Sequence, residues 1–324
     1  MKKHLLILFA AVAVAVACSQ NADNRFMPAF TEDFSTPQPQ FFFTKRSPLR
    51  YYSGVHSLSE ENTDVMLLAI TPSDPWGPAN GGAEIETPRL THFGTYSARL
   101  KMPDLTEVQP KAGVVTGFFT YLFVPGFGLA EIDFEWLMAD PRLIYIGTWT
   151  SEPDDLDKLQ RIGRIVNVET GEVLKTNYYS YRDAALVYEA PSHEFEPTDD
   201  AALEPRTIPA IPGYDASSRF HIYGFDWYPD RLRWWMEHPE TGEKVVLWDY
   251  RGSTQDFSGI PQGPTKYLLN FWHTNNWSVE TVPNSTEAPK YQYMLEADWI
   301  KYEPFDEINA KWLEENSKNT NTIY

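Results

Sequence analysis

The sequence predicts an all-β protein in which two antiparallel sheets pack face to face. Short segments of alternating apolar and polar residues recur along most of the chain, and glycine, proline, asparagine and aspartate separate them. Helical periodicity is almost absent, and this combination is typical of a β-sandwich. The expected strands are 65–70, 94–102, 113–122, 131–137, 143–149, 221–227, 231–236, 244–248, 266–272 and 295–302.

Residues 1–18 have the pattern of a bacterial export signal. Lys2 and Lys3 precede an apolar run that ends at Ala17, and the only cysteine of the chain, Cys18, follows. The run is too short to span a membrane comfortably. Residues 15–18 resemble a lipobox without its usual leucine, which implies lipidation of Cys18; an ordinary cleavable signal is the alternative. We therefore expect an exported protein, anchored by lipid to the outer membrane or surface of a diderm bacterium.

The remaining chain reads as one domain with a tether and a tail. Residues 19–48 are polar and rich in proline, which indicates a tether and a first edge strand, and residues 49–305 form the sandwich. Within it, residues 151–212 are acidic and read as a long irregular insertion, with a hairpin at 164–176 and a short helix at 183–190. Residues 306–324 read as a peripheral helix that fades into disorder.

The net charge argues against several classes of partner, and the cysteine content excludes stabilisation by disulfides. Removal of Lys2 and Lys3 with the signal moves the net charge from −18 to −20. Such acidity opposes binding to nucleic acid, to anionic lipid and to a strongly sulfated or uronic polymer, and it suits a neutral glycan better. Because no cysteine follows Cys18, the domain needs a large core in place of disulfides. Aromatic residues make up 15% of the chain, enough for rings that stack on sugars.

The most informative segment runs from Glu131 to Trp136. In a strand, Glu131, Asp133 and Glu135 share one face, while the apolar residues between them point to the core. The Cα atoms of the two glutamates are about 13 Å apart on such a strand. If they lean together, their carboxyl groups reach about 5.5 Å, the separation that a retaining glycosidase requires. A solvated acidic strand face is the plainer interpretation, although adjacent like charges repel.

The segment resembles the signature of glycoside hydrolase family 16, Glu, aliphatic, Asp, any, Glu, and the likeness extends over residues 82–302. Blocks such as FGTYSARLKMP, AGVVTGFFTY, YLLNFWHTNNW and EADWIKYEP resemble the lichenases of that family, which cut mixed-linkage β-glucan. The resemblance implies a concanavalin-like jelly roll. It also implies that Glu131 is the nucleophile, Asp133 an assisting carboxylate and Glu135 the general acid/base.

Substrate contacts follow from the same resemblance. It implies cleft positions for Glu84, Trp149, Asn270 and Trp272, with Trp277 as an outer candidate; core packing is the alternative for each tryptophan. Two departures from the lichenase sequences put the linkage that is cut in question. Leu129 and Ala130 replace the usual Trp and Asp, and Glu86 replaces an arginine. Asp298 matches a calcium ligand of some relatives, but one carboxylate makes no metal site. We therefore predict no metal and no cofactor.

The preferred function is a retaining endo-glycosidase that hydrolyses a β-glucan, either mixed-linkage β-1,3-1,4 or β-1,3, by double displacement. One alternative keeps the fold and chemistry but changes the polysaccharide to a galactan or xyloglucan, or transfers the sugar to another sugar. Another alternative is a glycan-binding surface lipoprotein without turnover. We expect a monomer whose partner is a polysaccharide and which meets the membrane only through its N-terminal lipid.

Overall fold

The computed structural model describes residues 24–46, 50–77, 81–106, 109–181, 204–252 and 259–317. Sixteen strands and one helix are defined in these ranges. The first sheet contains β1 (Phe30–Glu32), β3 (Tyr51–His56), β4 (Asp64–Ile70), β6 (Gly94–Lys101), β12 (His221–Tyr228), β13 (Arg231–Glu237), β14 (Lys244–Tyr250) and β16 (Tyr293–Pro304). The second contains β2 (Phe43–Arg46), β5 (Ala83–Glu86), β7 (Val114–Val124), β8 (Gly128–Leu137), β9 (Leu143–Glu152), β10 (Asp155–Asn167), β11 (Glu172–Ser180) and β15 (Tyr267–His273).

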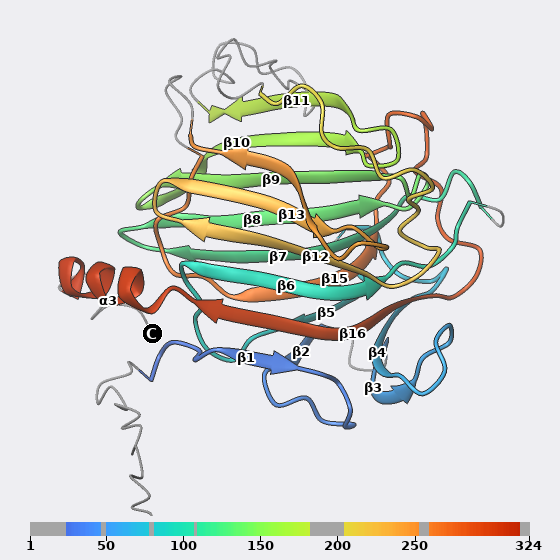
Figure 1. Cartoon of the computed structure of the whole chain (residues 1–324), viewed down its shortest axis with the longest axis horizontal. Coiled ribbons are helices and arrows are strands. Elements are labelled where there is room, and N and C mark those ends of the chain that lie inside the picture. Colours follow the sequence, from blue (N-terminus) through green and yellow to red (C-terminus); the bar gives the residue numbers. More distant parts are fainter. Residues whose placement is uncertain are drawn as a thin grey trace, which may run out of the picture.

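Both sheets are antiparallel, and each mixes strands from distant parts of the chain. The first has the order β14-β13-β12-β6-β16-β4-β3, with β1 also paired to β16. The second has the order β11-β10-β9-β8-β7-β15-β5-β2. The two sheets lie over one another, with the C-terminal helix beyond the ends of the strands, next to β16 (Figure 1). The predicted all-β fold with two antiparallel sheets is confirmed.

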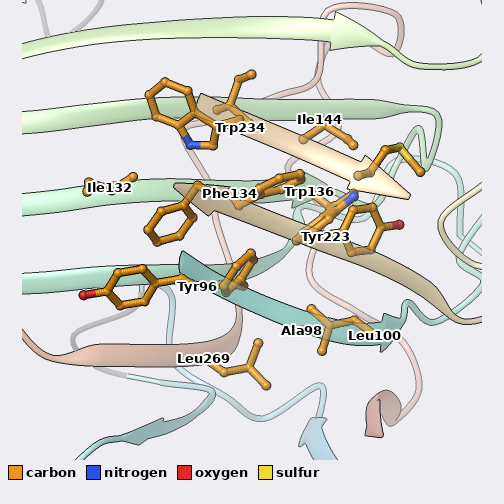
Figure 2. Packing of buried hydrophobic residues seen from close by; sticks show 14 of the residues in the cluster. Tyr96, Ala98, Leu100, Ile132, Phe134, Trp136, Ile144, Tyr223, Trp234 and Leu269 are labelled. Atoms are coloured by element: carbon orange, nitrogen blue, oxygen red, sulfur yellow. The ribbon is translucent and has the colours of Figure 1, made fainter. Parts of the chain in front are cut away.

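The core lies between the sheets because every second residue of each strand points inward. On β8 the inward residues Ile132, Phe134 and Trp136 have no exposed surface, and Tyr223 and Trp234 from the first sheet are equally buried. Figure 2 shows these rings interleaved between the layers. Phe134 stacks on Trp136 at 4.9 Å between ring centroids, and Trp136 meets Tyr223 edge to face at 4.7 Å. A core of this size accounts for a fold without disulfides.

All ten predicted strands are present, with ends displaced by a few residues. The predicted hairpin at 164–176 is confirmed within β10 and β11. The expectation that residues 151–163 are irregular is wrong, because β10 continues through them and pairs with β9. The turn residue Gly171 has a φ of 77°, which favours glycine. The expected short helix at 183–190 lies outside the described residues. The expected C-terminal helix is present as α3 (Asp306–Glu315), whose Trp312 is buried.

Replacement of Trp136 by alanine tests whether this interlayer packing holds the fold together. Loss of a fully buried tryptophan leaves a cavity, so we expect the free energy of unfolding to fall by about 3–5 kcal/mol. Urea denaturation measures it. Tyr291, which is 59% exposed, is the control, and Tyr291→Ala should change stability by less than about 0.5 kcal/mol. Equal losses in the two variants would contradict the packing described here.

Candidate active site

The three predicted carboxylates lie together on the outward face of β8. Asp133 is 3% exposed, and Glu131 and Glu135 are half-buried on either side of it. We name this side of the second sheet the carboxylate face. It exists because Ile132, Phe134 and Trp136 occupy the core on the other side.

Hydrogen bonds to the backbone hold β8 in place from both layers. The Trp234 indole of β13 donates to the carbonyl oxygen of Asp133 at 2.9 Å, across the sandwich. Within the second sheet, the Thr148 hydroxyl donates to the Glu131 carbonyl at 2.8 Å. The amide of Ile132 donates to the Thr120 hydroxyl at 3.1 Å. The register that aligns the carboxylates is therefore anchored at successive residues of the strand.

Burial makes it unfavourable for all three groups to be charged at once. Burial raises the pKa of Glu131 to about 8, and repulsion from Glu135 adds to the effect. Burial also raises the pKa of Glu135 to about 8, opposed by the positive charge of Arg161. The pKa of Asp133 lies well above its ordinary value because of burial and both neighbouring glutamates. Carboxyl groups that act on one another in this way lose their protons as a set.

On one side of β8, the carboxylate face continues through β9, β10 and β11. Strand pairing places Trp149 opposite Glu131, Arg161 opposite Trp149 and Tyr179 opposite Arg161. The Arg161 guanidinium lies over the Trp149 ring, 5.0 Å from its centroid, and the ring centroids of Trp149 and Tyr179 are 6.3 Å apart. The predicted substrate residue Trp149 thus lies beside the nucleophile candidate, with one face covered by arginine.

On the other side of β8, Glu84 and Asn270 are directly paired on β5 and β15. Both are nearly buried, at 4% and 5% exposure. Lys45 lies 3.5 Å from Glu84 and 3.1 Å from Glu86, so its ammonium group neutralises part of this acidic pair. Lys45 falls at a bulge between Thr44 and Arg46 of β2. A cation is therefore present beside Glu86, supplied by another strand.

Trp272 and Trp277 belong to a second apolar cluster at one end of the carboxylate face. Trp272 is 9% exposed and packs with Val115 and Val279. Trp277 is partly buried against the same cluster and meets Tyr145 edge to face at 5.5 Å. Both rings lie near the predicted site, and most of their surface is in contact with protein. Cys18 lies outside the described residues.

Sequence reasoning missed Arg161, Tyr145 and Lys45. Tyr145 pairs with Glu135, and its ring lies across Gly147 and Gly163, where an added Cβ would come within 2.6 Å and 2.5 Å of its hydroxyl. The hairpin turn at residues 169–171 was the sequence signal from which the position of Arg161 could have been predicted. Counting back from it by twos places Gly163 and Arg161 on one face of β10.

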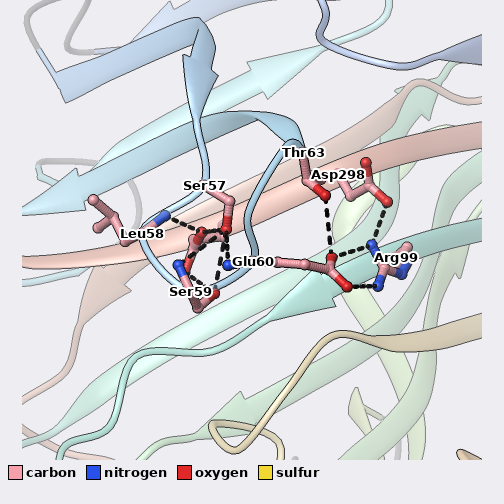
Figure 3. A network of polar contacts seen from close by, with 8 residues as sticks. Ser57, Leu58, Ser59, Glu60, Thr63, Arg99 and Asp298 are labelled. Carbon is pink, nitrogen blue, oxygen red and sulfur yellow. Dashed lines mark hydrogen bonds and ion pairs between the residues drawn. The ribbon is translucent and has the colours of Figure 1, made fainter.

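Asp298 serves the other sheet as an ion-pair partner. It lies at a bulge of β16 and accepts a 2.6 Å hydrogen bond from Arg99, which also binds Glu60 (Figure 3). Nearby, Glu296 accepts hydrogen bonds from the Ser57 hydroxyl, the Leu58 amide and the Ser59 hydroxyl. In the described ranges, no three His, Cys, Asp or Glu side chains group closely enough to hold a metal ion. Nor does any helix in those ranges have the length and apolar character of a membrane span.

Comparisons with known proteins concern the fold and the sequence as a whole. No family model matches the chain. The beta-glucanase of Bacillus subtilis is 27% identical over 217 residues, which cover 65% of this chain and 58% of that protein. A lichenase structure from a mouse hindgut metagenome matches at 19% identity and TM-score 0.50, over 86% of this chain and all of the other. The GH16 of the Bacteroides ovatus mixed linkage glucan PUL, in complex with a G4G4G3G product, matches at 12% identity and TM-score 0.51, over 84% and 99% of the two chains.

The fold is therefore a concanavalin-like jelly roll of two antiparallel sheets. The resemblance to glycoside hydrolase family 16, and within it to the lichenase-like glucanases, is confirmed. The chain spans less than two thirds of the length of the curated relatives it matches.

The raised pKa values predict that the site destabilises the protein at alkaline pH. A carboxyl group with a folded pKa of about 8, against an ordinary value of 4.5, binds its proton more tightly in the folded state. The contribution of this group to stability is fully present below pH 4.5 and is lost as the pH rises towards 8. Glu131→Gln removes this loss, so we expect its melting temperature to exceed that of the native protein by at least about 2 °C at pH 8 and by less at pH 5.

Differential scanning calorimetry at both pH values measures this effect. Glu243→Gln, at an exposed position of the first sheet's hairpin, is the matched control and should melt like the native protein at both. A melting temperature for Glu131→Gln that is equal to or below the native value at pH 8 would contradict the burial of charge described here.

Proposed function

We propose that the protein is a glycoside hydrolase that cleaves a β-glucan internally, with retention of anomeric configuration. The observation that carries this proposal is the set of three mutually interacting carboxylates on one face of β8. It is supported by the sequence similarity to beta-glucanases and by the shared fold.

In the proposed mechanism, Glu131 attacks the anomeric carbon while Glu135 protonates the departing glycosidic oxygen. Glu135 then takes a proton from water, which hydrolyses the covalent glycosyl-enzyme and restores both carboxyl groups. The raised pKa of Glu135 favours its protonated form, as its first role requires. The mechanism needs the first proton of the interacting set to leave from Glu131, which attacks as a carboxylate. Asp133, whose pKa is also raised by burial and by both glutamates, lies between them and can share a proton with the nucleophile.

The proposed substrate is a neutral β-glucan with mixed β-1,3-1,4 or β-1,3 linkages. The formal net charge of −18 opposes the approach of a strongly anionic polymer. The names of the relatives support a glucan: one is a beta-glucanase, and a solved neighbour is described in complex with a G4G4G3G product. Hydrolysis requires water as the acceptor of the glycosyl group, whereas a sugar acceptor would give transfer.

Assays on a panel of polysaccharides test the mechanism. The soluble domain that begins after Cys18 should release reducing ends from barley mixed-linkage glucan or laminarin, with xyloglucan and agarose as comparison substrates. Glu131→Gln should reduce the rate of reducing-end release to background, and Glu135→Gln should reduce that rate by about 10²–10⁴-fold. Proton NMR of the first products should show the β anomer.

Azide separates the two roles. Added to Glu131→Ala, it should give the α-glycosyl azide, because it replaces the nucleophile; added to Glu135→Ala, it should give the β-glycosyl azide. The opposite pattern would exchange the roles of the two glutamates. Initial release of the α anomer would exclude retention. Cleavage of agarose alone would move the substrate to galactans, and binding without cleavage would favour a glycan-capture protein.

We also propose that the protein is exported and held at the outer membrane or cell surface by a lipid on Cys18. The support is the order of Lys2 and Lys3, the apolar run and Cys18 in the sequence. Expressed in a diderm host, the full chain should partition into detergent, and Cys18→Ser should move it to the aqueous phase. Equal partitioning of both would leave an ordinary cleaved signal as the explanation.

A further inference from the structure

Tyr145 of β9 fills the part of the carboxylate face beside two of the three carboxylates. Strand pairing places it directly opposite Glu135, and it places Gly147, two residues further along β9, directly opposite Asp133. Opposite residues on antiparallel strands begin about 5 Å apart and project to the same face. An added Cβ at Gly147 would lie 2.6 Å from the Tyr145 hydroxyl. The ring therefore leans along β9 from the level of Glu135 to that of Asp133.

Two glycines leave the room that this ring occupies. Gly163 of β10 pairs with Gly147, and neither has a φ in the left-handed region that favours glycine. Glycine in the interior of a strand is less stable than a residue with a side chain, so the backbone gives no reason for it here. At Gly163 the three atoms nearest to an added Cβ all belong to Tyr145, at 2.5 to 2.8 Å. The pair of glycines therefore lets the ring lie close against the backbone of the sheet.

A tethered loop holds the ring in place. Trp277 meets it edge to face, with 5.5 Å between the ring centroids, and Tyr145 is only 6% exposed. The same loop brings Val279 into the apolar cluster that contains Tyr145. Further along the loop, the Thr281 hydroxyl donates a 2.5 Å hydrogen bond to Asp140, in the turn between β8 and β9. The ring is thus fixed between the sheet and the loop.

Glu135 has titratable neighbours on several strands. Those in the middle of the carboxylate face, within the described ranges, are Glu131 and Asp133 of β8, Tyr121 of β7, Tyr145 of β9, Arg161 of β10, Tyr179 of β11, Glu84 and Glu86 of β5 and Lys45 of β2. Burial raises the pKa of Glu135, and the positive charge of Arg161 opposes this effect. The group that buries Glu135 therefore decides in which form it stands.

We propose that Tyr145 is a positioning residue that keeps water from the β9 side of Glu135 and Asp133. It acts through these carboxyl groups and makes no bond to the sugar. An uncharged ring excludes water, and a carboxyl group that lacks water on one side favours its protonated form. The inference rests on the proposed function and deepens it, because it names the side chain that prepares the acid/base for its first role.

The pH profile of kcat/KM tests this role. Its alkaline limb reports the loss of the proton that Glu135 must donate. Tyr145→Ala admits water beside Glu135 and so lowers the pKa of that carboxyl group, and we expect the limb to move towards acid by about one pH unit. Tyr145→Phe keeps the ring and should leave the limb in place. A limb that stays in Tyr145→Ala, or that moves equally in Tyr145→Phe, would overturn the inference while leaving the proposed function intact.

Gly163→Ala tests the same role without a change at position 145. Its methyl group overlaps the ring and displaces it from the sheet, so the alkaline limb should move in the same direction as in Tyr145→Ala. In the Tyr145→Ala background the methyl group meets no ring, and the double variant should match Tyr145→Ala alone. Additive shifts of the limb would contradict the proposed role.

Leu143→Ala is the matched control for a general loosening of the site. Leu143 is 2% exposed in the same apolar cluster, two residues before Tyr145 on β9. The cavity should lower the melting temperature, and the alkaline limb should stay where it is in the native protein. A limb that moves as far in Leu143→Ala as in Tyr145→Ala would reduce Tyr145 to a packing residue.

Calorimetry gives a readout that does not depend on turnover. Burial raises the pKa of Glu135 to about 8, so the contribution of this group to stability is fully present below pH 4.5 and is lost as the pH rises towards 8. Glu135→Gln should therefore raise the melting temperature more at pH 8 than at pH 5. In the Tyr145→Ala background this difference should shrink by about a quarter or more.

The two readouts separate the inference from the proposed function. An unchanged difference in melting temperature would overturn the inference. A difference that shrinks, in a chain that cuts no polymer, would support the role of Tyr145 in burying Glu135 and would reject the proposed hydrolysis.

Discussion

The alternation of side chains along β8 is the constraint on which the site depends. Ile132, Phe134 and Trp136 are fully buried between the sheets, and this burial forces Glu131, Asp133 and Glu135 to the other side. A shift of one residue would put the three carboxyl groups in the apolar core, so the register is strongly specified. The Trp234 hydrogen bond to the Asp133 carbonyl fixes it further from the opposite layer. One face of β8 therefore supplies the core, and the other carries the candidate catalytic residues.

The same arrangement explains how an acidic protein holds a buried acidic site. Burial raises the pKa of all three groups, and repulsion between carboxylates adds to this at Glu131 and Asp133, which limits the charge that the three carry together. Arg161 opposes this effect at Asp133 and Glu135 from β10, and Lys45 lies against Glu84 from β2. The cations come from strands at some distance along the chain. The charge balance of the face is therefore a property of the assembled sheet.

Much of this could be predicted from the sequence, because strand periodicity and the carboxylate spacing are local signals. The sequence predicted ten strands, and the sharing of one face by Glu131, Asp133 and Glu135 followed from the alternation alone. The hairpin of β10 and β11 was partly missed, because its acidic residues hide the alternation. Lys45 depends on a bulge in β2, and the placement of Asn270 beside Glu84 depends on the pairing of β15 with β5, far apart along the chain. No local pattern encodes such pairings.

The position of β16 has a consequence for the order in which the protein folds. This strand lies between β6 and β4 in the first sheet, yet it is formed by residues 293–304. Its pairings join Tyr302 to Tyr96 and Leu295 to Leu68, so the middle of the sheet closes only when residues more than 200 positions apart meet. Contacts between residues so far apart in sequence form slowly, so the middle of the first sheet forms late in folding. During synthesis the chain therefore stays open until its last strand is available, and the sheet closes around that strand.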